Sequence, residues 1–311
     1  MEPGFDRDRH VAFFSVAYKR AWRNSSADSM KMTVLYFIIS ALDLLDVLEI
    51  VVDRKVVVEW IYRQQVIGDE ERWMNAGFRV GPCLGFAGES GSKYDYATLA
   101  STYCALCMLR ILGDDLTRVH KAAIVRAMPF MQQENGCFVS HPEGIECDAR
   151  FLYCACAISA LLNDWSGVDK AKATAYVLNS QDYQGAIGMN PKQEGHAGST
   201  YCAISSLSLM GTLDQLTHRE RLVEWLMERQ GEGFQGRVNK PLDSCYGFWV
   251  GGTCQTMGNR HIGLSNYLEK PLNCKFLYAL QGARGGFGKY SSEEVDLVHS
   301  YYSLCALSLL K

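Results

Sequence analysis

The 311-residue sequence has few of the features that divide a chain into parts. It contains only 7 prolines, and it has no Pro/Ser-rich segment and no run of like charges. Because linkers between domains usually have such compositions, we predict one domain over residues 1–311. Lys and Arg total 31 and Asp and Glu total 34, a formal net charge of −3. This balance gives no support to a nucleic-acid partner.

Long apolar runs without charge are also missing. The first ten residues are charged, so we expect no secretory signal. The most apolar stretch, residues 33–51, carries Asp43, Asp46 and Glu49 at three-residue spacing. This spacing predicts the charged face of an amphipathic helix and not a membrane span. The twelve cysteines lie largely in apolar runs, so we expect buried thiols in a reduced, cytoplasmic protein.

A repeated unit organises the chain. Each copy has a polar, glycine-containing loop and then an apolar helix with small residues that opens on a tyrosine. The tyrosines are Tyr103, Tyr153, Tyr201, Tyr246 and Tyr301. Their spacing of roughly 45 to 55 residues leaves room for two helices per copy. The second helix is amphipathic and is expected at residues 115–128, 167–179, 218–228 and 266–279.

Apolar helices that alternate with amphipathic ones predict an inner and an outer layer. The apolar inner layer leaves no exposed binding face for an open solenoid, so we favour closure of the repeats into an all-α, α/α toroid. Closure would bring polar residues at the starts of the inner helices to one end of a central cavity. These residues are Arg150, His196, Arg237, Lys240, Asp243, Cys245 and His299. An apolar funnel with a cationic rim suits an amphiphile with a charged head and a hydrocarbon tail.

Three of these side chains form a candidate metal site. Asp243, Cys245 and His299 offer the mixed oxygen, sulfur and nitrogen ligands that suit zinc, with a fourth position open. Each also has an ordinary structural explanation, as a helix cap, a buried thiol and a core histidine. Because the matching segments recur at equivalent repeat positions, we favour the metal site.

Three segments resemble the motifs of protein prenyltransferase β subunits. They are GRVNKPLDSCYGFW at residues 236–249, EGHAGSTYC at 194–202 and DLVHSY at 296–301. The likeness runs from about Phe5 to the end of the chain. It implies that Asp243, Cys245 and His299 bind one Zn²⁺, which activates the cysteine thiol of a protein substrate. It also implies an obligate partner, the prenyltransferase α subunit.

The resemblance assigns further residues to the lipid donor. His196, Arg237, Lys240 and Tyr246 would surround the isoprenoid diphosphate, with Lys240 and Tyr246 counted as catalytic. Ala197 departs from the family, which usually has glycine there. The isoprenoid pocket would include Thr33, Phe37, Arg150, Tyr153, Trp249 and Val298.

Three positions separate the subfamilies. Thr33 and Val298 are small or aliphatic where farnesyltransferases have tryptophan and tyrosine, which favours a twenty-carbon lipid. Lys289 stands where farnesyltransferases have a magnesium-binding aspartate, so its charge could replace magnesium. We therefore predict geranylgeranyl transfer from geranylgeranyl diphosphate to proteins such as small GTPases that end in Cys-a-a-X, with X often Leu or Phe.

Alternatives remain open at this point. The Rab geranylgeranyltransferase and farnesyltransferase β subunits share the main motifs. A terpene cyclase would need an Asp-rich protonating motif, and the sequence has none. A non-enzymatic scaffold that binds isoprenoids or peptides would have no need of an open zinc site.

Overall fold

The computed structural model describes residues 4–68, 73–82, 95–258, 268–291 and 293–310, and most of them are helical. The chain forms two compact units. Unit I is Ala17–Ala175, and unit II joins Met1–Val16 to Tyr176–Lys311. Helices α1 (Arg7–Arg23) and α8 (Lys170–Asn179) have residues in both units. The single domain expected from the sequence stays a prediction.

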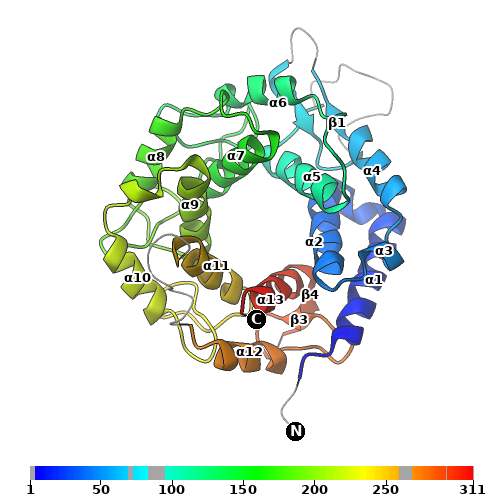
Figure 1. Cartoon of the computed structure of the whole chain (residues 1–311), viewed down its shortest axis with the longest axis vertical. Helices are drawn as coiled ribbons and strands as arrows, with labels where there is room; N and C mark the ends of the chain where they lie inside the picture. The colour runs from blue at the N-terminus through cyan, green and yellow to red at the C-terminus, as the bar shows by residue number, and fades with distance from the viewer. Residues whose placement is uncertain (1–3, 69–72, 83–94, 259–267, 292, 311) are drawn as a thin grey trace. The chain divides into compact units, whose positions relative to one another are not determined.

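Unit I is built on three apolar helices that pack side by side, with α5 in the middle (Figure 1). They are α2 (Lys31–Leu44), α5 (Leu99–Ile111) and α7 (Ala149–Leu162). Shorter helices form a second layer: α3 (Leu48–Val51), α4 (Arg54–Arg63) and α6 (Lys121–Ala127). The 3-10 turns η1 (Ser25–Met30), η2 (Trp73–Asn75) and η4 (Met128–Phe130) and the antiparallel pair β1 (Gln65–Val66) and β2 (Gly77–Phe78) connect them.

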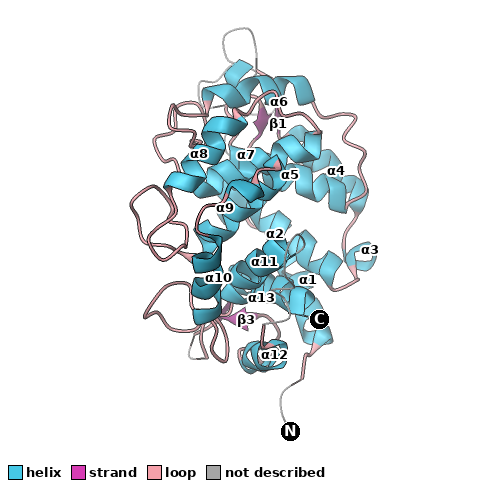
Figure 2. Cartoon of the chain, turned by 60° about the vertical axis from the view of Figure 1, so that its left-hand side comes forward, coloured by secondary structure: helices cyan, strands magenta, loops and turns pink. Residues whose placement is uncertain are grey.

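Unit II repeats the arrangement, with α11 packed between two other apolar helices. The three are α9 (Ala197–Met210), α11 (Tyr246–Gly258) and α13 (Leu297–Leu310). In the second layer, α10 (Arg219–Glu228) contacts α11, and α12 (Lys270–Ala279) contacts α13. The turn η5 (Leu213–Gln215) follows α9. Strands β3 (Phe287–Gly288) and β4 (Val295–Asp296) pair antiparallel, with Phe287 opposite Asp296. Figure 2 shows β3 in magenta among the helices.

All five predicted apolar helices and all four amphipathic ones are present, which confirms the alternation. The helix expected to begin at residue 115 begins at Lys121. Asp115 instead accepts a hydrogen bond from the Thr117 amide at 2.9 Å and forms a turn. The predicted start of the last amphipathic helix, at residue 266, lies outside the described residues.

One continuous helix over residues 33–51 was a wrong prediction. α2 ends at Leu44, and Asp46 has a positive φ of 53°. The Val47 amide donates to the Leu42 carbonyl at 3.0 Å, and the Asp46 amide donates to the Asp43 carbonyl at 2.9 Å. These two bonds form a Schellman motif, which satisfies the last carbonyls and stops the helix. Asp tolerates the left-handed conformation that this motif requires.

None of the described helices combines the length and the apolar character that crossing a bilayer requires. Within the described segments no disulfide joins the cysteines.

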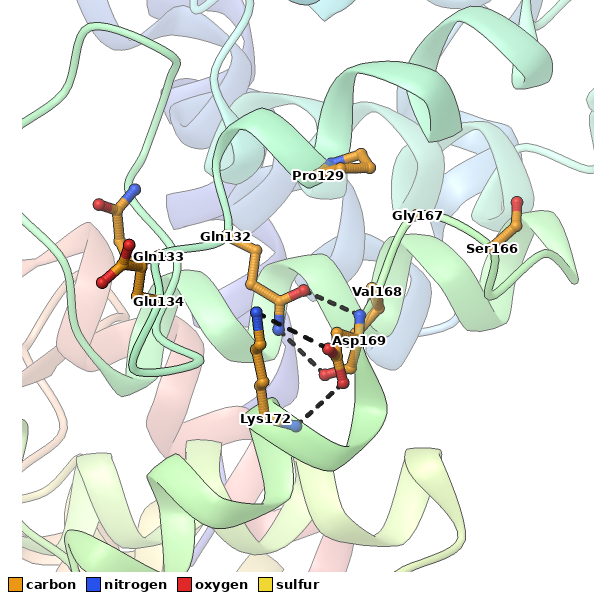
Figure 3. A pocket seen from close by; sticks show the side chains of 9 residues that line it. All are labelled: Pro129, Gln132, Gln133, Glu134, Ser166, Gly167, Val168, Asp169 and Lys172. Atoms are coloured by element: carbon orange, nitrogen blue, oxygen red, sulfur yellow. Dashed lines mark hydrogen bonds and ion pairs between the residues drawn. The ribbon is translucent and has the colours of Figure 1, made fainter.

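A glutamine precedes the glycine-containing loop of each repeat. Its side chain bonds to the backbone of a residue at the start of another helix. Gln132 donates to the Asp169 carbonyl at 3.0 Å and accepts from the Asp169 amide at 2.8 Å, beside a surface pocket (Figure 3). Equivalent bonds join Gln65 to His120, Gln181 to His218, Gln230 to Glu269 and Gln281 to Asp6. Each partner directly precedes a helix, so the glutamine satisfies a backbone amide that the helix leaves open.

The last glutamine holds the N-terminal segment within unit II. Gln281 accepts from the Asp6 amide at 3.1 Å and donates to the Gly4 carbonyl at 3.0 Å. Its Oε1 also lies 2.9 Å from Nε2 of His10. His10 is fully buried and stacks between the rings of Phe5 and Phe287, whose centroids lie 5.0 and 4.5 Å from its own. The Gly286 amide donates to His10 Nδ1 at 3.0 Å, so the buried ring is neutral.

Replacement of Gln281 should destabilise unit II. Gln281→Ala removes the bonds to Gly4, Asp6 and His10, and we expect a loss of about 1–3 kcal/mol of unfolding free energy with faster amide exchange in α1. Thermal unfolding and hydrogen exchange measure the two effects. Gln133→Ala is the matched control, because the Gln133 side chain is exposed and, among the described residues, bonds only to the Met131 carbonyl. Equal melting temperatures for both variants would contradict this role.

His10 should make stability depend on pH. Burial lowers its pKa below the ordinary value of 6.5, which outweighs the opposing effects of Gln281 and Asp6. A lowered folded-state pKa means that the unfolded chain binds the proton more tightly, so the stabilisation is complete above pH 6.5 and is lost as the pH falls below it. Melting temperatures from pH 7.5 down to pH 5.5 should therefore fall more steeply for the unmodified protein than for His10→Gln. Parallel curves would show that His10 does not titrate in this range.

Candidate metal and anion site

Three potential metal ligands meet where α11 and α13 begin. One ligand atom each from Asp243, Cys245 and His299 lies within 4.8 Å of the others. His299 Nε2 is 3.6 Å from Asp243 Oδ1. Asp243 and Cys245 directly precede α11 and His299 lies in the first turn of α13, so the packing of these two helices brings the three together. The structure thus groups the residues that the sequence proposed as metal ligands.

Backbone bonds hold Asp243 in place. Its amide donates to the Phe234 carbonyl at 3.0 Å, and its Oδ1 accepts from the Cys245 amide at 2.9 Å. The side chain is almost fully buried. A buried carboxylate requires a nearby positive charge, and Lys289 Nζ lies 3.9 Å from Asp243 Oδ2.

Asp296 orients His299, a role that the sequence did not reveal. Asp296 Oδ1 accepts from the His299 amide at 2.9 Å, and Oδ2 lies 2.5 Å from Nδ1. Nδ1 therefore carries a hydrogen, and Nε2 faces Asp243 Oδ1, where the neutral ring would offer its lone pair to a metal ion. Burial lowers the pKa of His299, but the bond and the charge of Asp296 outweigh it and raise the pKa overall. The three-residue spacing of Asp296 and His299 at the start of a helix was the available signal.

The Cys245 thiol needs a cation to ionise. Burial raises its pKa well above the ordinary value, and the nearby Asp243 carboxylate raises it further. Thiolate is the form that binds metals, and a coordinated thiol is deprotonated outright. A cluster of one carboxylate, one oriented imidazole and one thiol therefore has the chemistry of a metal site.

Cationic side chains lie on the segments that lead to this cluster, and Lys289 lies next to it. Arg237 and Lys240 lie on the loop that leads to Asp243, and Arg237 Nη1 is 3.3 Å from Glu194 Oε2. Lys240 is exposed, and Lys289 is about one-third exposed. Three accessible cations in this part of unit II offer binding groups for a polyanion.

His196 and Tyr246 form a hydrogen-bonded pair. His196 Nε2 is 3.0 Å from the Tyr246 hydroxyl, and His196 Nδ1 accepts from the Gly198 amide at 3.0 Å. The Ala197 amide donates to the Gly236 carbonyl at 2.9 Å, which joins the two segments. A Cβ atom at Gly236 would overlap the Tyr246 ring, so only glycine fits beneath it.

The residues predicted to line the isoprenoid pocket fall in both units. In unit II, Trp249 packs against Tyr201, Phe248 and Tyr302 at ring distances of 5.4, 5.0 and 4.5 Å, and Val298 is partly exposed. In unit I, Tyr103 packs against Tyr153 at 5.6 Å.

The other unit I residues have contacts of their own. Thr33 and Phe37 are half-buried on α2. Arg150 forms ion pairs of 2.6 Å with Asp148 and 2.5 Å with Glu146. The pocket itself stays a prediction.

Known proteins resemble this chain over nearly its whole length. Residues 5–311 match the prenyltransferase alpha-alpha toroid domain. Geranylgeranyl transferase type-1 subunit beta of Arabidopsis thaliana is 36% identical over 330 residues, covering 99% of this chain and 85% of that protein. The protein of the same name from Dictyostelium discoideum is 38% identical over 294 residues, covering 89% and 82%. The farnesyltransferase β subunit of Pisum sativum matches at 35% over only 58% of this chain and 43% of its own length.

A solved structure matches as well. The protein geranylgeranyltransferase-I of Candida albicans, complexed with GGPP, aligns with a TM-score of 0.83 at 26% identity, covering 98% of this chain and 91% of that chain. These matches confirm the α/α toroid fold class and the class of enzyme expected from the motifs. The chain belongs to the prenyltransferase alpha-alpha toroid family, and its nearly full-length relatives place it among the geranylgeranyl transferase type-1 β subunits.

Proposed function

We propose that this chain is the catalytic β subunit of a zinc-dependent protein geranylgeranyltransferase of type I. The observation that carries the proposal is the cluster of Asp243, Cys245 and His299 beside the Lys289 ammonium. A metal site and a cation next to each other suit a reaction that activates a thiol and releases a polyanion.

The lipid donor in this proposal is geranylgeranyl diphosphate. Two type-1 β subunits match 99% and 89% of this chain, whereas the farnesyltransferase β subunits of pea, Arabidopsis and Pyricularia oryzae match 58%, 60% and 71% of it. The solved relative was complexed with GGPP. Thr33 and Val298 agree with this choice, because small or aliphatic side chains leave space for a longer hydrocarbon.

The three ligands would hold one Zn²⁺. When bound, the ion supplies the positive charge that keeps the thiol of a protein substrate ionised near neutral pH. Asp296 holds His299 in the tautomer that leaves Nε2 available. Asp243, fixed by the Cys245 amide, supplies a carboxylate without reorganisation.

Arg237, Lys240, Tyr246 and Lys289 would receive the diphosphate. The substrate thiolate forms a carbon–sulfur bond at carbon 1 of the isoprenoid while the carbon–oxygen bond breaks, and the electron pair of that bond goes to the diphosphate. The cations and the Tyr246 hydroxyl stabilise the charge that develops on the diphosphate oxygens. The positive charge of Lys289 would replace that of a magnesium ion beside the diphosphate. We therefore also propose that the enzyme is active without magnesium.

The acceptor is a cysteine in a C-terminal Cys-a-a-X sequence, as in small GTPases. A prenyltransferase α subunit as the partner is part of the proposal, because the two relatives that match most of the chain are named as β subunits. A cytoplasmic location is part of it too, since the reaction needs a reduced substrate thiol.

Lipid and peptide choice test the function directly. The chain, co-expressed with a prenyltransferase α subunit, should transfer the twenty-carbon lipid to a Cys-a-a-Leu peptide without added magnesium. We expect a preference of at least about tenfold in kcat/KM over the fifteen-carbon lipid and over a Cys-a-a-Ser peptide, because pocket size alone discriminates by this order. Competition between the two diphosphates measures it. A preference for the fifteen-carbon lipid and Ser would instead assign the chain to the farnesyltransferases.

Removal of one metal ligand should separate binding from transfer. Cys245→Ala should lose zinc and lower kcat/KM on the order of a hundredfold or more, while prenyl diphosphate still binds, because the cations remain. Metal content, turnover and lipid-diphosphate binding are measured on one preparation. Cys274→Ala, on α12 and outside the cluster, is the matched control. Unchanged zinc content and turnover in Cys245→Ala would remove Cys245 from the metal site.

A further inference from the structure

The hairpin of β3 and β4 contacts both segments that carry the candidate metal ligands. Lys289 directly follows β3, and its carbonyl accepts from the amide of Ser244, which lies between two of the ligands, at 3.3 Å. In β4, Asp296 accepts from the His299 amide and lies 2.5 Å from its ring nitrogen Nδ1. A shift of this hairpin would therefore move the groups that hold the ligands on two sides.

Hydrogen bonds connect the two strands with each other and with α13. Phe287 pairs with Asp296 across the hairpin. The Phe287 amide donates to the Ser300 hydroxyl at 2.9 Å, and that hydroxyl donates to the Asp296 carbonyl. The position of the Asp296 carboxylate, and with it the orientation of the His299 ring, thus depends on how firmly Phe287 is held.

The N-terminal segment packs against the turn that leads into β3. The Gly286 amide donates to His10 Nδ1 at 3.0 Å, and the His10 ring stacks on the Phe287 ring with their centroids 4.5 Å apart. A Cβ atom at Gly285, whose φ is 83°, would overlap the Arg9 carbonyl. The backbone of the N-terminal segment therefore lies directly on the backbone of this turn.

Water cannot take over the contact between His10 and the turn. His10 is fully buried, and so is its bond to the Gly286 amide. Loss of the imidazole would leave a buried amide without an acceptor, which costs free energy, and would remove the ring on which Phe287 stacks. The turn would then have to move to satisfy its amide, and β3 would move with it.

We infer that His10 is a positioning residue for the metal site. The bond that it accepts from Gly286 holds β3 in place, and β3 in turn keeps Asp296 against the His299 ring. The inference deepens the proposed function and rests on the zinc site within it. A histidine binds a metal ion well only when its second ring nitrogen has a partner that fixes the direction of the ring. His10 acts on that partner and is not itself a ligand.

Three substitutions of His10 separate its bond to Gly286 from the rest of the side chain. His10→Ala removes the imidazole entirely. His10→Asn keeps an oxygen near the position of Nδ1, where it can accept from the Gly286 amide. His10→Gln keeps a polar group near the position of Nε2 and leaves that amide without its acceptor.

The matched control is Gln181→Ala, which alters the same kind of joint elsewhere in unit II. Gln181 lies between α8 and α9, accepts from the His218 amide at 3.3 Å and donates to the Gly185 carbonyl at 2.8 Å. Its loss should lower the melting temperature without loosening the β3–β4 hairpin.

Zinc affinity tests the role of His10. In the heterodimer with a prenyltransferase α subunit, His10→Ala should raise the Kd for Zn²⁺ on the order of tenfold, because loss of outer-shell support costs about 10- to 100-fold in metal affinity. His10→Asn should regain most of the affinity, and His10→Gln should not. Gln181→Ala should stay within about threefold of the unmodified protein, since it is independent of the hairpin. Competition with a chelating dye measures each Kd.

Three results would overturn the inference. The first is an unchanged zinc Kd in His10→Ala. The second is a His10→Asn protein that binds zinc no more tightly than His10→Gln, because the bond to Gly286 would then not carry the effect. This comparison also decides if His10→Ala does not fold. The third is an equal loss of zinc affinity in Gln181→Ala and His10→Ala, which would reduce the effect to a general loss of stability.

Proton NMR of the heterodimer reads the contact between Asp296 and His299 without any turnover. A ring hydrogen in a bond of 2.5 Å gives a signal far downfield, which is assigned by its loss in Asp296→Asn. In His10→Ala this signal should broaden or move upfield, and in Gln181→Ala it should stay. An unchanged signal in His10→Ala would contradict the role of His10.

Failure of the proposed function would look different. An unmodified heterodimer that binds no zinc or transfers no prenyl group would reject that function. A heterodimer that binds zinc and is active, but in which His10→Ala changes neither the zinc Kd nor the His299 signal, would reject only the inference about His10.

Discussion

The packing of α11 between α9 and α13 is the constraint on which the site depends. Each of these helices is apolar and carries small residues along its length, so the helices approach closely and their starts align within unit II. Asp243 and Cys245 enter from the loop before α11, His299 from α13 and His196 from the residue before α9. No local motif contains all four. Their proximity is a property of the packed layer, and a change in helix spacing would disperse the metal ligands before it unfolded any helix.

The repeat made most of the secondary structure predictable. The regularly spaced tyrosines marked the starts of the apolar helices, because each repeat packs against its neighbours in the same way and uses similar residues. The ends of the helices were harder to predict from the sequence. The end of α2 depends on the left-handed conformation of Asp46, and the late start of α6 depends on a turn at Asp115. Both are decided by a few local hydrogen bonds that compete with an otherwise favourable helical pattern.

The sequence allowed us to predict the site residues whose side-chain chemistry is specific to metal binding. It did not reveal the contacts that depend on how the chain folds. An Asp, a Cys and a His near a cationic loop have a recognisable donor pattern, and the structure groups them. Asp296 lay in the same motif as His299, yet nothing in the residue types indicates that its carboxylate meets Nδ1. The partners of His196 were equally hidden, because one is a backbone amide and the other lies fifty residues away. The glutamine joints share this difficulty. Gln132, Gln181 and Gln230 bind backbone 37 to 39 residues further on, whereas Gln65 binds backbone 55 residues on and Gln281 binds backbone 275 residues back.

The joint at Gln281 has a consequence for how the protein is made. Gly4, Asp6 and His10 bond to residues about 275 positions later. During synthesis the N-terminal segment therefore leaves the ribosome long before its partners exist. The His10 ring cannot stack on Phe287 until the β3 turn has been translated. Such distant contacts form late because the chain must first lose the entropy of closing a long loop. Unit II thus completes only when this late part of the chain meets the N-terminal segment.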